Sequence, residues 1–134
     1  MNTKLDRMFE NDFVRVPRPF IRRFNLNTAM MLSEIYSEYR YWKDRDALQE
    51  GGWFFSTIEN MYYNTGLSKH QQLCACKELQ EYGIIKIKYY GMPKKRYFKF
   101  NTSVLNQLYN DFQLHSNTGD EPQEITREFS GFSF

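Results

Sequence analysis

Hydrophobic residues recur at helical spacing from about Thr28 to Lys43. They stand at i, i+3, i+4, i+7 and i+10 of one repeating stripe: Leu32, Ile35, Tyr36, Tyr39 and Trp42. The positions between them hold mostly serine, glutamate and arginine. The pattern therefore predicts an amphipathic helix that buries one stripe, with Asn27 as its N-cap.

A short second helix is predicted after an apolar strand. Trp53–Phe55 is a brief β-like run, and the sequence from Ser56 to Glu59 is a capping box that should open a helix. The helix should end near Asn64, because Gly66 can take the positive φ of a tight turn.

A third helix is predicted directly after that turn. Ser68 and Gln71 form the S-x-x-Q capping box at its start, and Gly83 is typical of the residue that ends a helix. Spacing by three and four predicts that its inward residues are Gln72, Ala75, Cys76 and Leu79, with Tyr82 as a further candidate. Two capped helices across a tight turn are typical of a helix-turn-helix motif.

Two β-like runs, Ile84–Tyr90 and Arg96–Phe100, form a predicted hairpin joined by Gly91–Lys95. In the first run apolar and basic residues alternate, which predicts one core face and one cationic face. The short strand before the second helix is expected to pair with this hairpin. These elements predict an α+β fold, a winged helix-turn-helix with a three-helix core and the basic hairpin as its wing.

The N-terminal part of the chain carries weaker patterns. Residues 1–12 are polar and mixed in charge, so we expect a flexible N-terminus. Phe13–Val16 resembles a short strand stopped by proline, and Phe20–Phe24 predicts a single helical turn.

The C-terminal part predicts one extra helix and a tail. Apolar residues at helical spacing predict the helix from about Ser103 to Leu114, and we expect residues 115–134 to form a disordered acidic tail. The winged-helix domain should therefore span residues 13–114.

Positive charge is concentrated in the hairpin. The net charge of the chain is +2, whereas Ile84–Phe100 contains six basic residues and no Asp or Glu. In the tail the acidic residues outnumber the single basic one: Asp120, Glu121, Glu124 and Glu128 against Arg127. A polyanion is therefore the expected partner of the hairpin, and double-stranded DNA is the leading candidate. Protection of an exposed sheet edge by lysines is the alternative.

Candidate DNA contacts lie on the third helix and on the wing. The N-terminal half of a recognition helix meets base edges in the major groove, and the candidates there are Ser68, Lys69, His70, Gln71, Leu73 and Lys77. The wing candidates suit a phosphate backbone or a minor groove, and they are Lys86, Lys88, Lys94, Lys95, Arg96 and Lys99. Tyr90, Tyr97 and Phe98 leave stacking on single-stranded nucleic acid open. A structural helix whose polar face meets only water is the alternative for the third helix.

The sequence contains no pattern of catalytic or metal-binding residues. It has no phosphate-binding loop, no nucleophile elbow and no H-E-x-x-H sequence. Cys74 and Cys76 should point to nearly opposite sides of the third helix, so we expect neither a disulfide nor a shared metal site. His70 and Cys74 alone would leave zinc short of ligands. We therefore expect no enzymatic activity, no cofactor and no metal.

Membrane association and secretion are not expected either. No apolar run approaches the roughly 20 residues of a membrane-spanning helix. The N-terminus also lacks the apolar stretch of a secretory signal. These features predict a cytoplasmic protein without a membrane partner.

The run from Phe13 to Asn101 resembles a known group of winged-helix domains. The matching features are G-W-F-F-S-T before the second helix, L-S-x-x-Q-Q at the start of the third, L-x-E-Y-G-I-I at its end, and G-M-P-K-K-R-Y-F-K-F-N across the wing. They are similar to the N-terminal domains of phage and plasmid replication initiators of Gram-positive bacteria, with the replisome-organiser and DnaD-like proteins as the nearest group. The resemblance implies a double-stranded DNA-binding module, often a homodimer, that reads DNA through the third helix and the wing. Such initiators carry a further helical or ATPase-loading domain, whereas one helix and an acidic tail follow here.

The function expected from these features is sequence-directed binding of double-stranded DNA in the initiation of replication, or its control, in a phage or mobile element. Transcriptional regulation is the first alternative. The second is a protein–protein adaptor, in which the winged helix docks one partner and the phenylalanine-ended tail recruits another. An inert tail, or one that folds back on the wing, is equally open.

Overall fold

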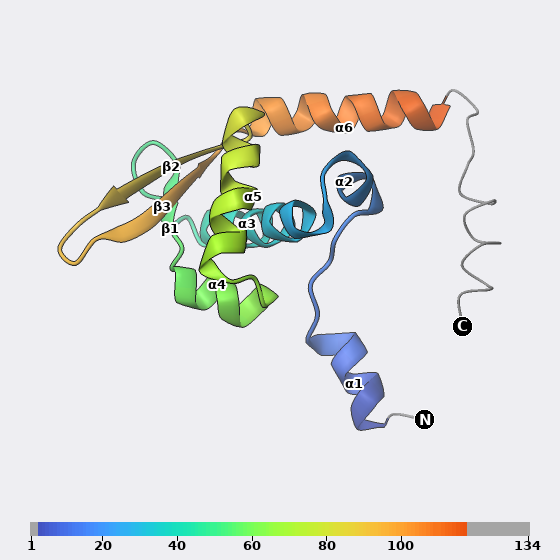
Figure 1. The fold of residues 1–134 in the computed structure, drawn as a ribbon, viewed down its shortest axis with the longest axis horizontal. Coiled ribbons are helices and arrows are strands. Elements are labelled where there is room, and N and C mark those ends of the chain that lie inside the picture. The colour runs from blue at the N-terminus through green and yellow to red at the C-terminus, as the bar shows by residue number, and fades with distance from the viewer. Residues whose placement is uncertain (1–2, 118–134) are drawn as a thin grey trace. The chain divides into compact units, whose positions relative to one another are not determined.

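Residues 3–117 are described in the computed structural model, with the side chains of residues 3–113. They form six helices and one three-stranded sheet (Figure 1). The helices are α1 (Lys4–Asn11), α2 (Arg18–Arg23), α3 (Leu26–Asp44), α4 (Ile58–Thr65), α5 (Lys69–Glu81) and α6 (Thr102–Asn117). The strands are β1 (Trp53–Phe55), β2 (Ile85–Tyr90) and β3 (Lys95–Phe100). The chain divides after Asn101 into two units, 1–101 and 102–134, and the domain span predicted from the sequence stays a prediction.

The helix α3 supplies the centre of the core in the first unit. Leu32 and Ile35, both in the predicted stripe, are fully buried. The predicted N-cap Asn27 is wrong by two residues, because the side-chain oxygen of Asn25 accepts a hydrogen bond from the Thr28 amide at 2.7 Å. The N-cap of α3 is therefore Asn25, the earlier of the two asparagines.

The strands form an antiparallel sheet in the order β1-β3-β2. One face of this sheet packs against α3 through aromatic rings: the centroid of Tyr39 lies 6.2 Å from that of Phe54 and 5.4 Å from that of Phe100. Phe98 pairs with Phe54 across β3 and β1 and is fully buried. Burying one large apolar side chain contributes roughly 1.5–3 kcal/mol, so these rings fix the hairpin to the helices.

The helices α4 and α5 form the predicted helix-turn-helix. The Thr57 side chain caps α4 by accepting a hydrogen bond from the Asn60 amide at 3.0 Å. The predicted capping box between Ser56 and Glu59 is therefore wrong, and Ser56 is buried. Gly66 ends α4 with a positive φ of 77°, as predicted.

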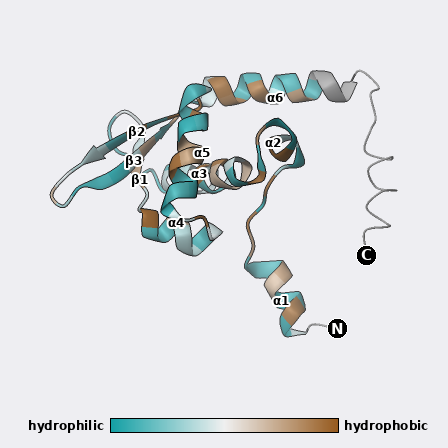
Figure 2. Ribbon diagram, viewed as in Figure 1, coloured by the Kyte–Doolittle hydropathy of each residue, from teal (hydrophilic) through white to brown (hydrophobic). Residues whose placement is uncertain are grey.

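These elements confirm the predicted α+β winged-helix fold. The helices α3, α4 and α5 are the three-helix core, and the β2–β3 hairpin is the wing. Figure 1 shows the hairpin projecting to one side of α5. In Figure 2 most of the hairpin has hydrophilic to neutral colours, whereas hydrophobic colours recur along the helices.

The N-terminal segment differs from its prediction. Residues Lys4–Asn11 form α1, whose first turn is held by reciprocal hydrogen bonds between Thr3 and Asp6. This helix was not predicted, although Leu5, Met8 and Phe9 stand at helical spacing, i, i+3 and i+4. None of its residues is buried. The strand predicted at Phe13–Val16 is wrong, since this segment lies outside every strand of the described residues. The predicted helical turn that follows is α2.

The second unit contains α6, and its helix is confirmed with a longer C-terminal end than predicted. The predicted tail at residues 115–134 therefore begins inside this helix. Its remaining residues, 118–134, lie outside the described residues. No helix of the described part of the chain is long and apolar enough to cross a membrane.

Candidate nucleic-acid interface

A capping box holds the start of α5, as predicted. The Ser68 hydroxyl oxygen accepts a hydrogen bond from the Gln71 amide at 3.2 Å, and Gln71 Oε1 accepts one from the Ser68 amide at 2.9 Å. Both donors would otherwise lack a partner inside the helix. The box also occupies Gln71 Oε1, so the side-chain NH₂ is the part of Gln71 that remains for contacts with a ligand.

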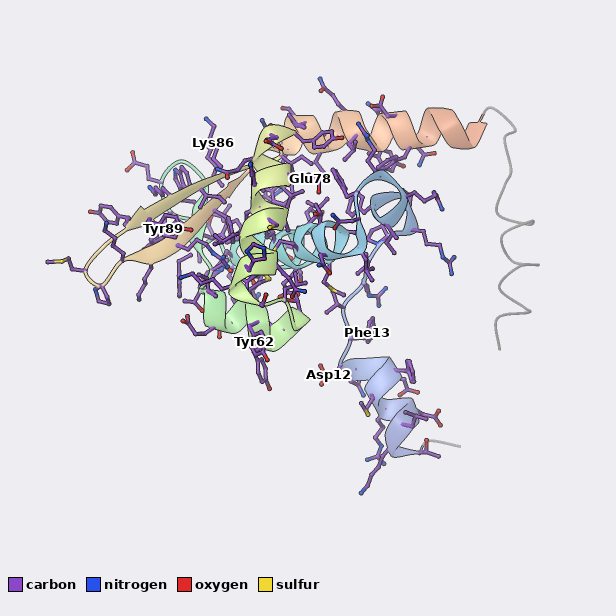
Figure 3. All side chains as sticks on the ribbon, in the orientation of Figure 1. Asp12, Phe13, Tyr62, Glu78, Lys86 and Tyr89 are labelled. Atoms are coloured by element: carbon purple, nitrogen blue, oxygen red, sulfur yellow. The ribbon has the colours of Figure 1, made fainter. Side chains whose placement is uncertain are left out.

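The inward face of α5 is fixed to the helices around it. Gln72 is fully buried, and its Nε2 donates to the carbonyls of Leu67 at 2.9 Å and Ile58 at 3.1 Å. Glu78 Oε1 accepts a hydrogen bond from the Thr28 hydroxyl at 2.7 Å, which ties α5 to α3 (Figure 3). The outward residues of α5 are therefore presented on a rigid element.

The outward face of α5 contains all six residues predicted there, and all are exposed: Ser68, Lys69, His70, Gln71, Leu73 and Lys77. Leu73 is 43% exposed, so an apolar side chain stands among the polar ones. The first turn has no acidic residue, and a helix N-terminus carries partial positive charge. This face therefore favours a negatively charged partner.

The cysteines lie on different sides of α5 and are free. Cys74 is exposed, and its sulfur lies 3.6 Å from His70 Nε2. Cys76 is buried, and burial raises the pKa of its thiol to about 11. Among the residues that the structure describes, no group of three or more His, Cys, Asp or Glu is placed to hold a metal ion.

Alternation along the strands divides the wing between two faces. The inward positions near the helices pack on the core, and they include the buried residues Ile85, Phe98 and Phe100, whereas Tyr89, closer to the tip, is exposed. We call the other side the outer face, and its residues are Trp53, Phe55, Lys86, Lys88, Tyr90, Lys95, Tyr97 and Lys99. In Figure 3 Lys86 and Tyr89 lie on opposite sides of β2, as this alternation requires. Lys94 is exposed in the turn at the tip.

Arg96 is the exception among the predicted wing contacts. Its side chain is only 3% exposed. Arg96 Nε donates to the Ser56 carbonyl at 3.0 Å and Nη2 donates to the Thr57 carbonyl at 3.4 Å. The prediction that it contacts DNA is corrected here, because Arg96 has the inward parity of Phe98 and holds the β1–α4 connection. The other residues predicted as DNA contacts stay predictions.

The carboxylate of Glu38 on α3 interacts with Arg96, and that of Glu34 lies beside Glu38. Burial raises the pKa of Glu38 to about 7, and the positive charge of Arg96 opposes this rise in part. Burial also raises the pKa of Glu34 and lowers the pKa of Arg96. Both carboxylates line an open cavity of about 340 Å³ between α3 and α4. The Arg96 guanidinium therefore lies among buried groups of the fold and not on the exposed surface of the wing.

Patterning missed the contribution of β1 to the outer face. Phe54 is buried, so its neighbours Trp53 and Phe55 face outward. The Lys88 ammonium lies 4.3 Å from the centroid of the Trp53 ring, and that of Lys95 lies 5.2 Å from the Phe55 ring. Alternation within W-F-F was the available signal, but only the register of β1 on β3 shows that these rings join the lysines of the wing.

Solved structures of two other proteins share this fold. One, described as the N-terminal domain of a DNA-binding protein, is 13% identical in sequence, with 75% of this chain and 82% of that chain covered and a TM-score of 0.53. The other, described as a Rep–DNA complex, is also 13% identical, with 75% and 83% covered and a TM-score of 0.54. At this identity the likeness shows the fold alone. No protein-family model matches the chain, and no curated protein sequence matches it.

Proposed function

We propose that this protein binds double-stranded DNA in a sequence-directed way, through the outward face of α5 and the tip of the wing. The observation that carries the proposal is the outward face of α5. It combines exposed lysines and an exposed amide with a first turn that has no acid, on a helix whose other face is buried. A rigid helix with this surface suits the major groove.

The biological role we propose is the initiation of replication, or its control, in a phage or mobile element. Support comes from the structural neighbour described as a Rep–DNA complex and from the sequence motifs that resemble replication initiators. The protein acts in this proposal by binding, without a chemical step of its own.

Each candidate residue has a role set by its chemistry. Lys69 and Lys77 bind phosphates, which position the helix without reading sequence. The Gln71 NH₂ group donates to a base edge, and Leu73 contacts a thymine methyl group. Lys94 at the wing tip binds the neighbouring backbone or the minor groove.

The test is the salt dependence of duplex binding, followed by fluorescence anisotropy with the full chain. Lys69→Ala, Lys77→Ala and Lys94→Ala should each lower the slope of log K against log salt by about 0.9, the effect of one lost phosphate contact. Lys4→Ala on α1 is the matched control and should leave the slope unchanged. Absence of duplex binding at low salt, or an equal loss in the control, would refute the proposal.

The replication role needs a separate measurement. Fragments of the genome that encodes the protein should be selected by the purified chain and then sequenced. Enrichment of one site inside a replication origin is the expected result. Enrichment of promoters instead would replace the replication role with transcriptional regulation, and the duplex-binding proposal would stand.

A further inference from the structure

We propose that the outer face of the sheet is a second nucleic-acid surface, one that binds single-stranded DNA by stacking bases on its aromatic rings. The proposal rests on the arrangement of residues across all three strands and is independent of α5. It concerns a different surface and a different form of DNA from the duplex contacts proposed above, which lie on α5 and at Lys94 in the tip of the wing.

The strand register arranges the outer face as a grid. The first row across the sheet is Trp53, Lys99 and Lys86, the second is Phe55, Tyr97 and Lys88, and the third is Lys95 and Tyr90. Neighbouring strands lie about 4.8 Å apart, so members of one row are neighbours on the surface. Half of the grid positions are thus aromatic rings, and the other half are lysines.

The aromatic rings of the grid lie in series. The centroid of Tyr97 lies 6.3 Å from that of Phe55 and 6.4 Å from that of Tyr90. On the far side of Phe55, the ring of Trp42 on α3 follows at 5.9 Å. Tyr90 is 68% exposed, so the series ends in a ring with open faces. Bases of any sequence can stack on such rings.

The lysines of the grid stand beside these rings. The Lys88 ammonium lies 4.3 Å from the Trp53 ring centroid, 5.8 Å from that of Tyr97 and 5.9 Å from that of Tyr90. No outward position of the three described strands holds Asp or Glu. A base that stacks on a ring therefore finds an ammonium group within reach of its own phosphate, and the charge of the surface complements a polyanion.

A single strand fits this surface better than a duplex. In a duplex the bases are stacked on each other, and their flat faces are closed to protein rings, whereas unpaired bases expose them. Lysines alone would serve a duplex backbone, but rings between the lysines add nothing to backbone contact. The alternation of rings with lysines is the combination that channels for single strands use.

The first test uses the intrinsic fluorescence of Trp53. The full chain carrying Trp42→Phe has Trp53 as its single tryptophan and is titrated with oligothymidine and with a random duplex. We expect quenching by oligothymidine and little quenching by the duplex. Equal quenching by both, or none by oligothymidine, would overturn the proposal.

The second test separates the two surfaces by substitution. Tyr90→Ala removes an exposed ring without touching the core, and it should weaken oligothymidine binding about fivefold to a hundredfold while duplex binding stays unchanged. Tyr109→Ala, at an exposed tyrosine on α6, is the control and should change neither. Lys69→Ala should weaken duplex binding alone. Retention of oligothymidine binding in Tyr90→Ala, or an equal loss in the control, would overturn the proposal.

Failure of this proposal is distinguishable from failure of the duplex proposal. A chain that binds duplex through α5 but gives no Trp53 quenching loses only the outer-face surface. A chain that quenches with oligothymidine but does not bind duplex loses only the α5 assignment. Parallel losses of both ligands in Tyr90→Ala would indicate one shared surface and would overturn the outer-face proposal.

Discussion

Replacing Arg96 should destabilise the fold, although its charge and its place in the wing suggest a DNA contact. Its guanidinium donates to the carbonyls of Ser56 and Thr57, and its central carbon lies 4.7 Å from the centroid of the Phe98 ring. A hydrogen bond from a charged group contributes roughly 1.5–3 kcal/mol. The 3.4 Å bond is long, so we count one such bond in full, plus the loss of packing on Phe98. Arg96→Ala should therefore lower the free energy of unfolding by about 3 kcal/mol.

The same substitution should have a signature in pH. Arg96 is the cation that opposes the raised pKa of Glu38. Without it, ionised Glu38 would be buried with no positive charge to compensate, so its pKa should rise further. The destabilisation by Arg96→Ala should consequently be larger at pH 8, where Glu38 must ionise, than at pH 5.

Urea unfolding followed by far-ultraviolet circular dichroism measures both effects. Lys94→Ala is the matched control from the exposed tip, and it should change stability by no more than about 0.5 kcal/mol. Arg96→Lys keeps the charge but not the planar fork of donors, so it should lose less than Arg96→Ala and more than the control. Suppose instead that Arg96→Ala unfolds at the wild-type urea midpoint while the salt slope of duplex binding falls. Arg96 would then be a DNA contact, and its buried hydrogen bonds would be irrelevant to folding.

Two further predictions concern single residues of the body. The folded-state pKa of Glu38, about 7, lies above its ordinary value of 4.5, so the folded protein holds this proton more tightly. The free energy of unfolding should therefore fall by up to about 3 kcal/mol as pH rises from about 4.5 to 7, and then level off. Glu38→Gln should remove most of this fall when urea unfolding is measured at a series of pH values. An equal fall in the wild type and the variant would contradict the prediction. Gly66 has a positive φ, and a Cβ there would meet no atom within 4 Å. Gly66→Ala should thus lower the stability by about 1 kcal/mol in thermal unfolding, because alanine is strained in the left-handed backbone conformation. Gly66→Asn should lower it less. A loss of several kcal/mol would instead indicate a steric clash.

The recognition helix could be predicted almost completely, because its determinants are local. The capping box joins Ser68 to Gln71, three residues apart, and the inward stripe follows from helical spacing alone. The turn before it depends on one glycine, Gly66. Interactions within a few residues leave a pattern in the sequence, so both the helix and its exposed face were predicted at the correct positions.

The N-terminal residues show where local reasoning ends. The helix α1 has an apolar stripe of Leu5, Met8 and Phe9 at helical spacing, but these side chains are exposed. The polar, mixed-charge composition of residues 1–12 predicted a flexible segment instead, and the Thr3–Asp6 capping pair also marks the start of the helix. Phe13–Val16 has the composition of a strand, but a strand exists only where a neighbour supplies hydrogen bonds. Composition alone therefore predicted an element that no neighbouring strand completes.

Arg96 could have been placed correctly from the strand pattern. Phe98 and Phe100 stand two and four residues after it, so a core face that contains them also contains Arg96. Arginine is seldom fully buried without partners, which favours the exposed assignment. The partners that overturn it are carbonyls about forty residues earlier in the chain, at a distance where sequence patterning gives no information.

The six cations of the hairpin therefore lie in three different environments, although their summed charge was the strongest indication of a polyanionic partner. Arg96 is buried inside the fold and Lys94 lies at the tip, whereas the other four, all lysines, lie on the outer face among aromatic rings. Strand parity separates these roles more sharply than charge does, because neighbouring residues of a strand face opposite directions. In our proposals a duplex bound by α5 takes backbone contacts from the tip of the wing. The rest of the positive charge is then available to a second ligand, and a single strand is the form of DNA that uses the rings as well as the lysines.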